Sequence, residues 1–252
     1  MNRALPLRNT ARAAAILFSF MLSGCYWGKV QETKYYVLDY VPTPPPERIQ
    51  KGPYPFVLRL RDCEIAEAYR RSQIVYRQSA NQMQFYGLHL WAVDPDRMMT
   101  DLALKHLKAA QLFDNVTRTV ENFVPDYYLS CNVQAIEEFD SKEQVYSHLA
   151  IEYQLENAKT NVITWKKLYD LRKAVAQPEP IYVVRELSEL AETINDRLVQ
   201  ELDVVLDEAK YKKQEKVDSV RADTAVHGAA GSERQAGPAA SGPVREAGKA
   251  KR

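Results

Sequence analysis

The chain has 252 residues, 46% of them hydrophobic, and its 34 lysines and arginines almost balance its 33 aspartates and glutamates. A formal net charge of +1 provides no strongly basic surface, so we expect no nucleic-acid partner. The length is sufficient for a single hydrophobic core with additional tails.

Residues 1–24 have the composition of a secretory signal peptide. Arg3, Arg8 and Arg12 precede an apolar run at 13–22, and no acidic residue lies among them. At about 1.5 Å per residue this run is too short to cross a hydrocarbon core roughly 30 Å thick. We therefore expect a segment that directs export and is then removed.

The signal ends in Leu22-Ser23-Gly24-Cys25, which resembles the lipobox of bacterial lipoproteins. The resemblance implies that the Cys25 thiol carries a diacylglycerol, that cleavage occurs before Cys25, and that the new amine accepts a fatty acid such as palmitate. Two or three acyl chains hold a protein stably on a bilayer. Tyr26 stands where lipoproteins of the inner membrane tend to have aspartate, which favours the outer membrane of a Gram-negative bacterium, facing the periplasm. The alternative is an ordinary signal peptide with an incidental cysteine.

A tether is expected at 25–33, followed by one domain at 34–212. Aromatic and β-branched residues predict a strand at 34–40, and the prolines between 42 and 46 end it. Alternation at 55–61 predicts a second strand, and a short helical turn follows at 65–69. A polar turn at 79–81 between two strand-like segments predicts a hairpin.

Asp94 and Pro95 mark the start of a helix that continues to about residue 112, with Asp94 as the expected cap. Its apolar stripe includes His106, which we expect to pack at the border of the core. His89 has no cysteine or acidic partner at the spacing of a metal site, and no metal or cofactor is expected.

A strand is expected at 115–120, and three longer segments then alternate with period two, which predicts an antiparallel meander with one buried face. The residues expected on that face are Tyr127, Leu129, Cys131, Val133 and Ala135, then Leu149, Ile151, Tyr153 and Leu155, then Ile163, Trp165, Tyr169 and Leu171. His148, Glu137 and Glu138 are expected to be solvated. Cys63 and Cys131 allow two alternatives, a disulfide between them or two buried free thiols.

The last element is a long amphipathic helix at about 181–210, in which apolar residues recur at three- and four-residue steps. We expect it to cover the sheet, with pairing to a partner helix as the alternative. From residue 213 the chain has no aromatic, leucine or isoleucine residue, so we expect a disordered tail at 213–252. The predicted fold is α+β, an antiparallel or mixed sheet with two main helices packed on one face.

Several residues together resemble the PqiC-like auxiliary lipoproteins of ABC-type transport systems. They are Lys34-Tyr35-Tyr36-Val37-Leu38 after the lipobox, Arg71-Ser72-Gln73-Ile74-Val75, Phe85, Trp91-Ala92 and Pro95. The resemblance extends to about residue 210. It implies an accessory role in the transport of lipids or other hydrophobic molecules, by docking to the MCE-type periplasmic subunit of an ABC transporter, in one arrangement as a ring of identical copies.

Catalytic signatures are missing from the sequence. It has no glycine-rich phosphate loop followed by lysine, no Gly-x-Ser-x-Gly elbow and no His-Glu-x-x-His motif, so we expect no enzyme. Two other functions stay open: an outer-membrane assembly or secretion lipoprotein, and a carrier that binds lipid in its own cavity.

Overall fold

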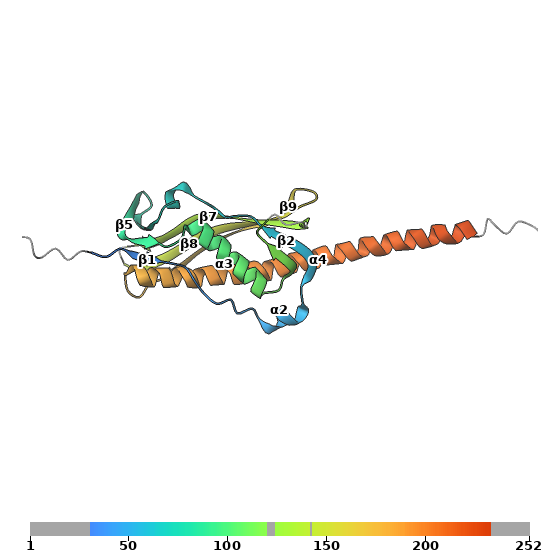
Figure 1. Cartoon of the computed structure of the whole chain (residues 1–252), viewed down its shortest axis with the longest axis horizontal. Helices are drawn as coiled ribbons and strands as arrows, with labels where there is room; N and C mark the ends of the chain where they lie inside the picture. Colours follow the sequence, from blue (N-terminus) through green and yellow to red (C-terminus); the bar gives the residue numbers. More distant parts are fainter. Residues whose placement is uncertain (1–30, 120–123, 142, 233–252) are drawn as a thin grey trace, which may run out of the picture.

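The computed structural model describes residues 31–119, 124–141 and 143–232. These residues form an α+β fold in which a mixed, open sheet carries helices on one face (Figure 1), as the sequence predicts. The strands are β1 (Lys34–Tyr36), β2 (Tyr54–Leu60), β3 (Glu64–Ile65), β4 (Gln73–Ser79), β5 (Gln82–Trp91), β6 (Phe113–Thr117), β7 (Tyr127–Asp140), β8 (Val145–Asn157) and β9 (Val162–Ala174). The helices are α2 (Pro46–Lys51), α3 (Pro95–Ala109) and α4 (Pro180–Ser232), with a 3₁₀ turn, η2, at Glu67–Tyr69.

Strand β7 is the centre of the sheet. One of its edges pairs with β8 in antiparallel fashion along its whole length. The other edge pairs in turn with β2, β3 and β4, all parallel to β7. The hairpin of β4 and β5 then extends the sheet to β1, and β2 extends it to β6. Because parallel and antiparallel pairs meet at one strand, the sheet is mixed.

The meander of β7, β8 and β9 supplies most of the core, and Leu149, Ile151, Tyr153 and Leu155 of β8 are fully buried. The Asn157 side chain holds the turn before β9 by accepting hydrogen bonds from the backbone of Lys159 and Thr160. Ala135 is buried as predicted, although a register shift in β7 pairs it with Ala150 and so moves it to the other face of the sheet. The prediction for Ile163 was wrong, because a shift between β8 and β9 places it beside Glu156 and leaves it 52% exposed. Each extra residue inverts the side-chain alternation that follows it.

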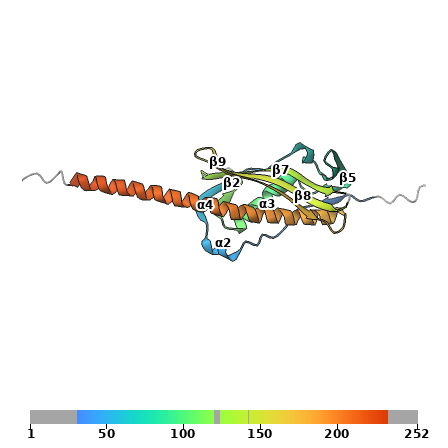
Figure 2. The same ribbon diagram turned by 180° about the vertical axis from the view of Figure 1, so that it is seen from behind.

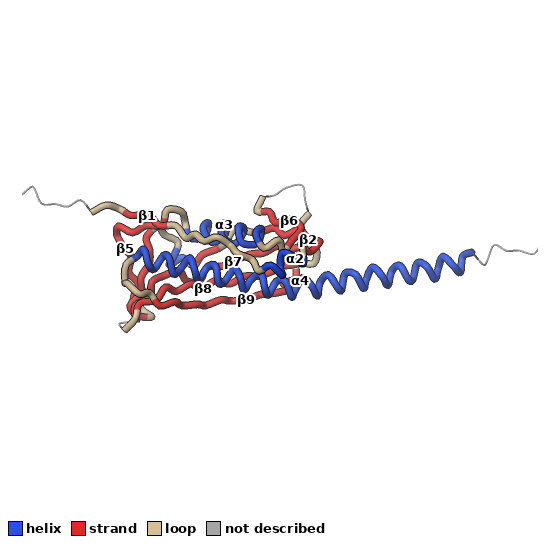
Figure 3. The backbone as a smooth tube through the Cα atoms, turned by 90° about the horizontal axis from the view of Figure 1, so that it is seen from below, coloured by secondary structure: helices blue, strands red, loops and turns tan. Residues whose placement is uncertain are grey.

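Helix α3 begins at Pro95 as predicted, but the Asp94 side chain makes no capping hydrogen bond. The buried stripe of α3 includes Met99, Ala103 and Leu107, which are completely covered by the core. Thr100 of the same helix is also buried, and its hydroxyl is satisfied there because it donates to the carbonyl of Asp96. The helix packs against β6 and α4 under one face of the sheet (Figure 3).

Helix α4 has 53 residues and is therefore about 80 Å long. Its first half covers β8 and β9 with a stripe at three- and four-residue spacing, of which Leu187, Ile194 and Leu198 are fully buried. Its second half extends beyond the sheet (Figure 2). The prediction of a disordered tail from residue 213 was wrong over 213–232, where the chain is helical, while 233–252 lie outside the described residues.

Candidate functional site

The first described residues and the free end of helix α4 lie at opposite ends of the described structure. After β1 it runs beside α4 in the same direction. Asp39 lies beside Ser188, Tyr40 beside Asn195 and Arg48 beside Asp203. The first described residues therefore lie near the beginning of α4, and the free half of α4 points away from them (Figure 1). Cys25, the predicted lipidation site, lies outside the described residues.

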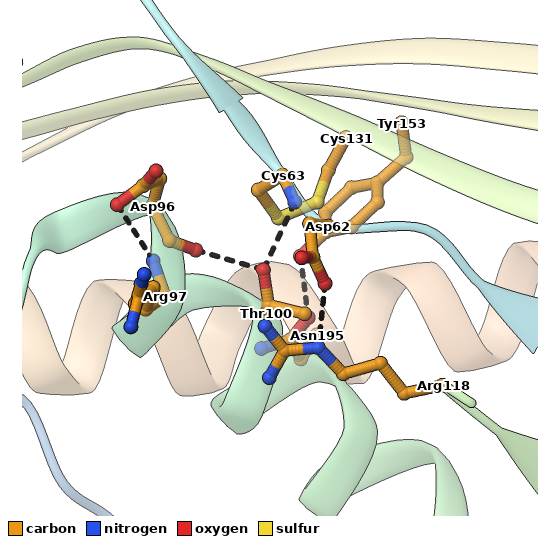
Figure 4. The surroundings of a disulfide bond; sticks show 9 residues. All are labelled: Asp62, Cys63, Asp96, Arg97, Thr100, Arg118, Cys131, Tyr153 and Asn195. Atoms are coloured by element: carbon orange, nitrogen blue, oxygen red, sulfur yellow. Dashed lines mark hydrogen bonds and ion pairs between the residues drawn. A yellow bond between two sulfur atoms is a disulfide. The ribbon is translucent and has the colours of Figure 1, made fainter.

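Cys63 and Cys131, for which the sequence left two alternatives, form a disulfide in the structure. The Cα atoms are 4.6 Å apart, and both residues are buried between the sheet and α3 (Figure 4). The backbone nitrogen of Cys63 donates to Thr100 of α3 at 2.9 Å. The disulfide thus ties the segment between β2 and β3 to the central strand, which is a structural role.

A buried polar cluster lies on the other face of the sheet. Glu137 accepts hydrogen bonds from Tyr69 at 2.6 Å and from Arg77 at 2.9 Å. The two ring nitrogens of His148 face Glu137 and Asp170, at 3.0 and 2.9 Å. The sequence prediction that Glu137 and His148 are solvated was wrong, because Tyr69 and Arg77 cover them and leave Glu137 only 2% exposed. The period-two pattern of the strands contains no information about side chains, such as Tyr69 and Arg77, that reach this face from elsewhere in the chain.

The neighbouring carboxylates Glu137 and Glu138 have opposite electrostatic environments. Burial raises the pKa of Glu137, but hydrogen bonds from His148, Tyr69 and Arg77 outweigh it, so the pKa lies below its usual value. Burial also raises the pKa of Glu138, and the one hydrogen bond from Tyr86 does not compensate. The prediction that Glu138 is solvated was also wrong, since it is 5% exposed.

A second polar network crosses the core below the sheet. Tyr153 of β8 donates to Asn195 of α4 at 3.0 Å, and Asn195 donates to Tyr40 at 2.7 Å. His106, predicted to pack at the border of the core, is in fact only 1% exposed; it lies beside Tyr40 and 3.2 Å from Asp196. Burial of the His106 ring lowers its pKa, and Asp196 opposes this only in part. The network fixes α4 on the sheet.

A cavity of about 240 Å³ lies between α2, the preceding prolines and α4. Its wall includes Arg48, Asp196, Asp203 and His106. Arg48 is buried and is held by Asp203 and by the carbonyl of Gly52. Arg48 and Asp203 pair with each other, and Pro44, Pro45 and Val199 give the same wall apolar parts.

The sequence model for the ABC-type transport auxiliary lipoprotein component matches residues 36–199, which include every strand except the first residues of β1. The chain belongs to this family. Among curated proteins, none is similar enough to this lipoprotein to count as a match.

Two solved structures share the fold of this auxiliary lipoprotein. Protein XCC0632 from Xanthomonas campestris has a TM-score of 0.62 at 14% identity, covering 71% of this chain and 99% of its own. A second solved structure, of an uncharacterized protein, has a TM-score of 0.55 at 13% identity, covering 68% of this chain and 99% of its own. At these identities the likeness shows the fold alone.

The described parts of the auxiliary lipoprotein contain neither a membrane-spanning helix nor a cluster of metal-ligating side chains. No helix there has the length and apolar character needed to span a membrane. Over the same residues, histidine, cysteine and carboxylate side chains do not gather into a set of three able to hold a metal ion. His148 illustrates why, since its two nitrogens face carboxylates on opposite sides of the ring.

Proposed function

We propose that this auxiliary lipoprotein is anchored through lipidated Cys25 in the outer membrane of a Gram-negative bacterium, on the periplasmic side. There it docks to the MCE-type periplasmic subunit of an ABC transporter that moves lipids or other hydrophobic molecules. The match of residues 36–199 to the transport auxiliary family carries the proposal. The lipobox at 22–25 supports the anchor, because it immediately precedes the tether and the folded domain.

Docking explains the architecture better than a carrier function does. The cavity beside Arg48 has about 240 Å³, below the roughly 300–1,000 Å³ typical of small-molecule sites, and the larger hollows of about 470 Å³ beside Phe113 and about 440 Å³ beside Glu137 are more open to solvent. Its wall also contains Glu47, Asp196 and Asp203, whose carboxylates disfavour an acyl chain. In this proposal the protein has no catalytic role, and the cluster around Glu137 stabilises the fold.

The test is affinity purification of the tagged, natively lipidated protein from membranes, with mass spectrometry of the co-purifying proteins and of the N-terminus. We expect an MCE-type subunit and an acylated Cys25. The Cys25→Ser variant should be lost from the membrane fraction and should recover at least tenfold less of that subunit.

Other outcomes separate the parts of the proposal. If only a β-barrel or a secretion component is recovered, the anchor proposal stands but the MCE-type partner is wrong, and the protein is an assembly or secretion lipoprotein. An unacylated Cys25 would contradict the anchor. Size-exclusion chromatography with light scattering tests the proposed ring of copies, which would elute as a multiple of the monomer mass.

A further inference from the structure

His148 of β8 stands between two carboxylates that belong to the strands on either side of it. Its Nδ1 atom lies 3.0 Å from Oε1 of Glu137 in β7, and its Nε2 atom lies 2.9 Å from Oδ1 of Asp170 in β9. An ionised carboxylate only accepts hydrogen bonds, so a ring nitrogen that bonds to it has to carry a proton. Both contacts are therefore hydrogen bonds only when the imidazole ring holds two protons.

The bridge joins the centre of the sheet to its border. Strand β9 lies at the border of the sheet (Figure 3), and among the described strands it pairs with β8 and with no other. Glu137 directly opposes His148 in the β7–β8 pair, and Ala150, two residues along β8, opposes Asp170. The three polar side chains thus lie on one face of the sheet, where they line a hollow of about 440 Å³.

The Glu137 end of the bridge is enclosed. Tyr69 of η2 and Arg77 of β4 both donate to Oε2 of Glu137, which leaves Oε1 to the His148 ring. Glu137 is 2% exposed, so bulk water does not replace a donor that is lost there. A buried acceptor without a donor is costly, and the proton on Nδ1 is therefore the one that the ring retains.

The Asp170 end of the bridge is open. The Asp170 side chain is 55% exposed, so water satisfies its carboxylate when the contact to His148 is lost. Arg172, which opposes His148 in the β8–β9 pair, is the other charged residue of β9 that lines this hollow, and its guanidinium lies over the ring of Phe139 at 4.8 Å. The proton on Nε2 is therefore the one that the ring loses first.

We propose that Glu137, His148 and Asp170 form a pH-sensitive latch that holds the border strand β9 to β7. With two protons on the ring the latch is closed. With one proton, Nδ1 still donates to Glu137, while the lone pair of Nε2 faces Asp170 and leaves that carboxylate to water. Histidine is the side chain whose charge ordinarily changes between about pH 5 and 8, so acid closes the latch and mild alkali opens it. The inference goes beyond the proposed function and does not depend on it.

The first test is nitrogen-15 NMR of the imidazole rings in the full mature chain. The chain has four histidines, and His148→Gln identifies the His148 signals by their loss. Both ring nitrogens of His148 should carry a proton at pH 5.5, and only Nδ1 should carry one at pH 8. A ring that has one proton at pH 5.5, or that holds a proton on Nε2 at pH 8, would overturn the latch.

Urea unfolding provides a second readout. Asp170→Asn should lower the urea midpoint by about 0.3 M at pH 5.5, where it removes the charge that faces the doubly protonated ring, and should leave it unchanged at pH 8. The matched control is Glu152→Gln. Glu152 of β8 pairs with Lys166 of β9 at 2.9 Å, and lysine stays charged at both pH values, so this variant should lose the same midpoint at each.

The comparison of the two variants decides between a latch and an ordinary surface contact. If Asp170→Asn loses the same midpoint at pH 5.5 and pH 8, as the control does, the contact is independent of the histidine proton and the latch is wrong. The latch is also wrong if Asp170→Asn has no effect at pH 5.5. An unchanged circular dichroism spectrum would confirm that both variants are folded.

Discussion

The disulfide between Cys63 and Cys131 offers a quantitative test of the fold. The two residues are 68 positions apart, so the bond removes a large loop-closure entropy from the unfolded chain. The chain-entropy relation gives about 4 kcal/mol for a loop of this length. We therefore expect the double variant Cys63→Ser, Cys131→Ser to lose about that much free energy of unfolding.

Urea unfolding of the mature chain, followed by circular dichroism, measures the loss. With a denaturant slope of about 2–3 kcal/mol per M, the midpoint should fall by roughly 1.5 M. Treating the unmodified protein with a thiol reductant should give a similar shift, while the double variant should not respond to reductant. Equal midpoints for the variant and the unmodified oxidised protein would refute the reasoning.

Three further predictions concern packing and charge. Leu198→Ala should cost about 2–5 kcal/mol in urea unfolding because Leu198 is fully buried, whereas Val204→Ala, at a position 62% exposed on the same helix, should cost far less. Asp203→Ala should cost about 3 kcal/mol because it leaves the Arg48 side chain, 4% exposed, without its carboxylate, and Asp207→Ala, at a 61% exposed side chain, serves as the control. The folded-state pKa of Glu138 is raised, so ionisation of Glu138 costs stability as the pH rises through that pKa. Glu138→Gln should therefore have a higher urea midpoint than the unmodified protein at pH 7 and an equal midpoint below about pH 4, where both side chains are uncharged. Glu137→Gln should have a lower urea midpoint than the unmodified protein at pH 7, because the folded-state pKa of Glu137 is lowered and the stability that its charge contributes is lost only in acid. If the two variants have the same midpoint at pH 7, the two carboxylates do not have opposite environments.

The helical segment at 213–232 shows what a composition argument cannot decide. The absence of large apolar residues predicts that this segment lacks a core of its own, but it does not predict how the backbone folds. Lysine, glutamate, glutamine and alanine favour helix, and α4 already provides the nucleated turns that a new helix lacks. Glu208 lies 4.0 Å from Lys212, and Gln214 donates to Asp218, at the helical spacing of four.

The sequence by itself determined the elements whose signal is local. Period-two alternation specified the core face of β8, the three- and four-residue stripe specified α4 over the sheet, and Pro95 specified where α3 begins. The family followed from short motifs spread along the chain. The lipobox, which leads to the proposed anchor, is equally local, because an export signal depends on consecutive residues.

Only the tertiary structure decided the features that join distant residues. The bulge near Ala135 depends on how β7 pairs with β8, and the burial of Glu137 depends on Tyr69 and Arg77, which lie 60 or more positions earlier. The pairing of Cys63 with Cys131 needed β3 to lie beside β7. Long-range proximity of this kind follows from chain packing, and a sequence pattern contains no measure of it.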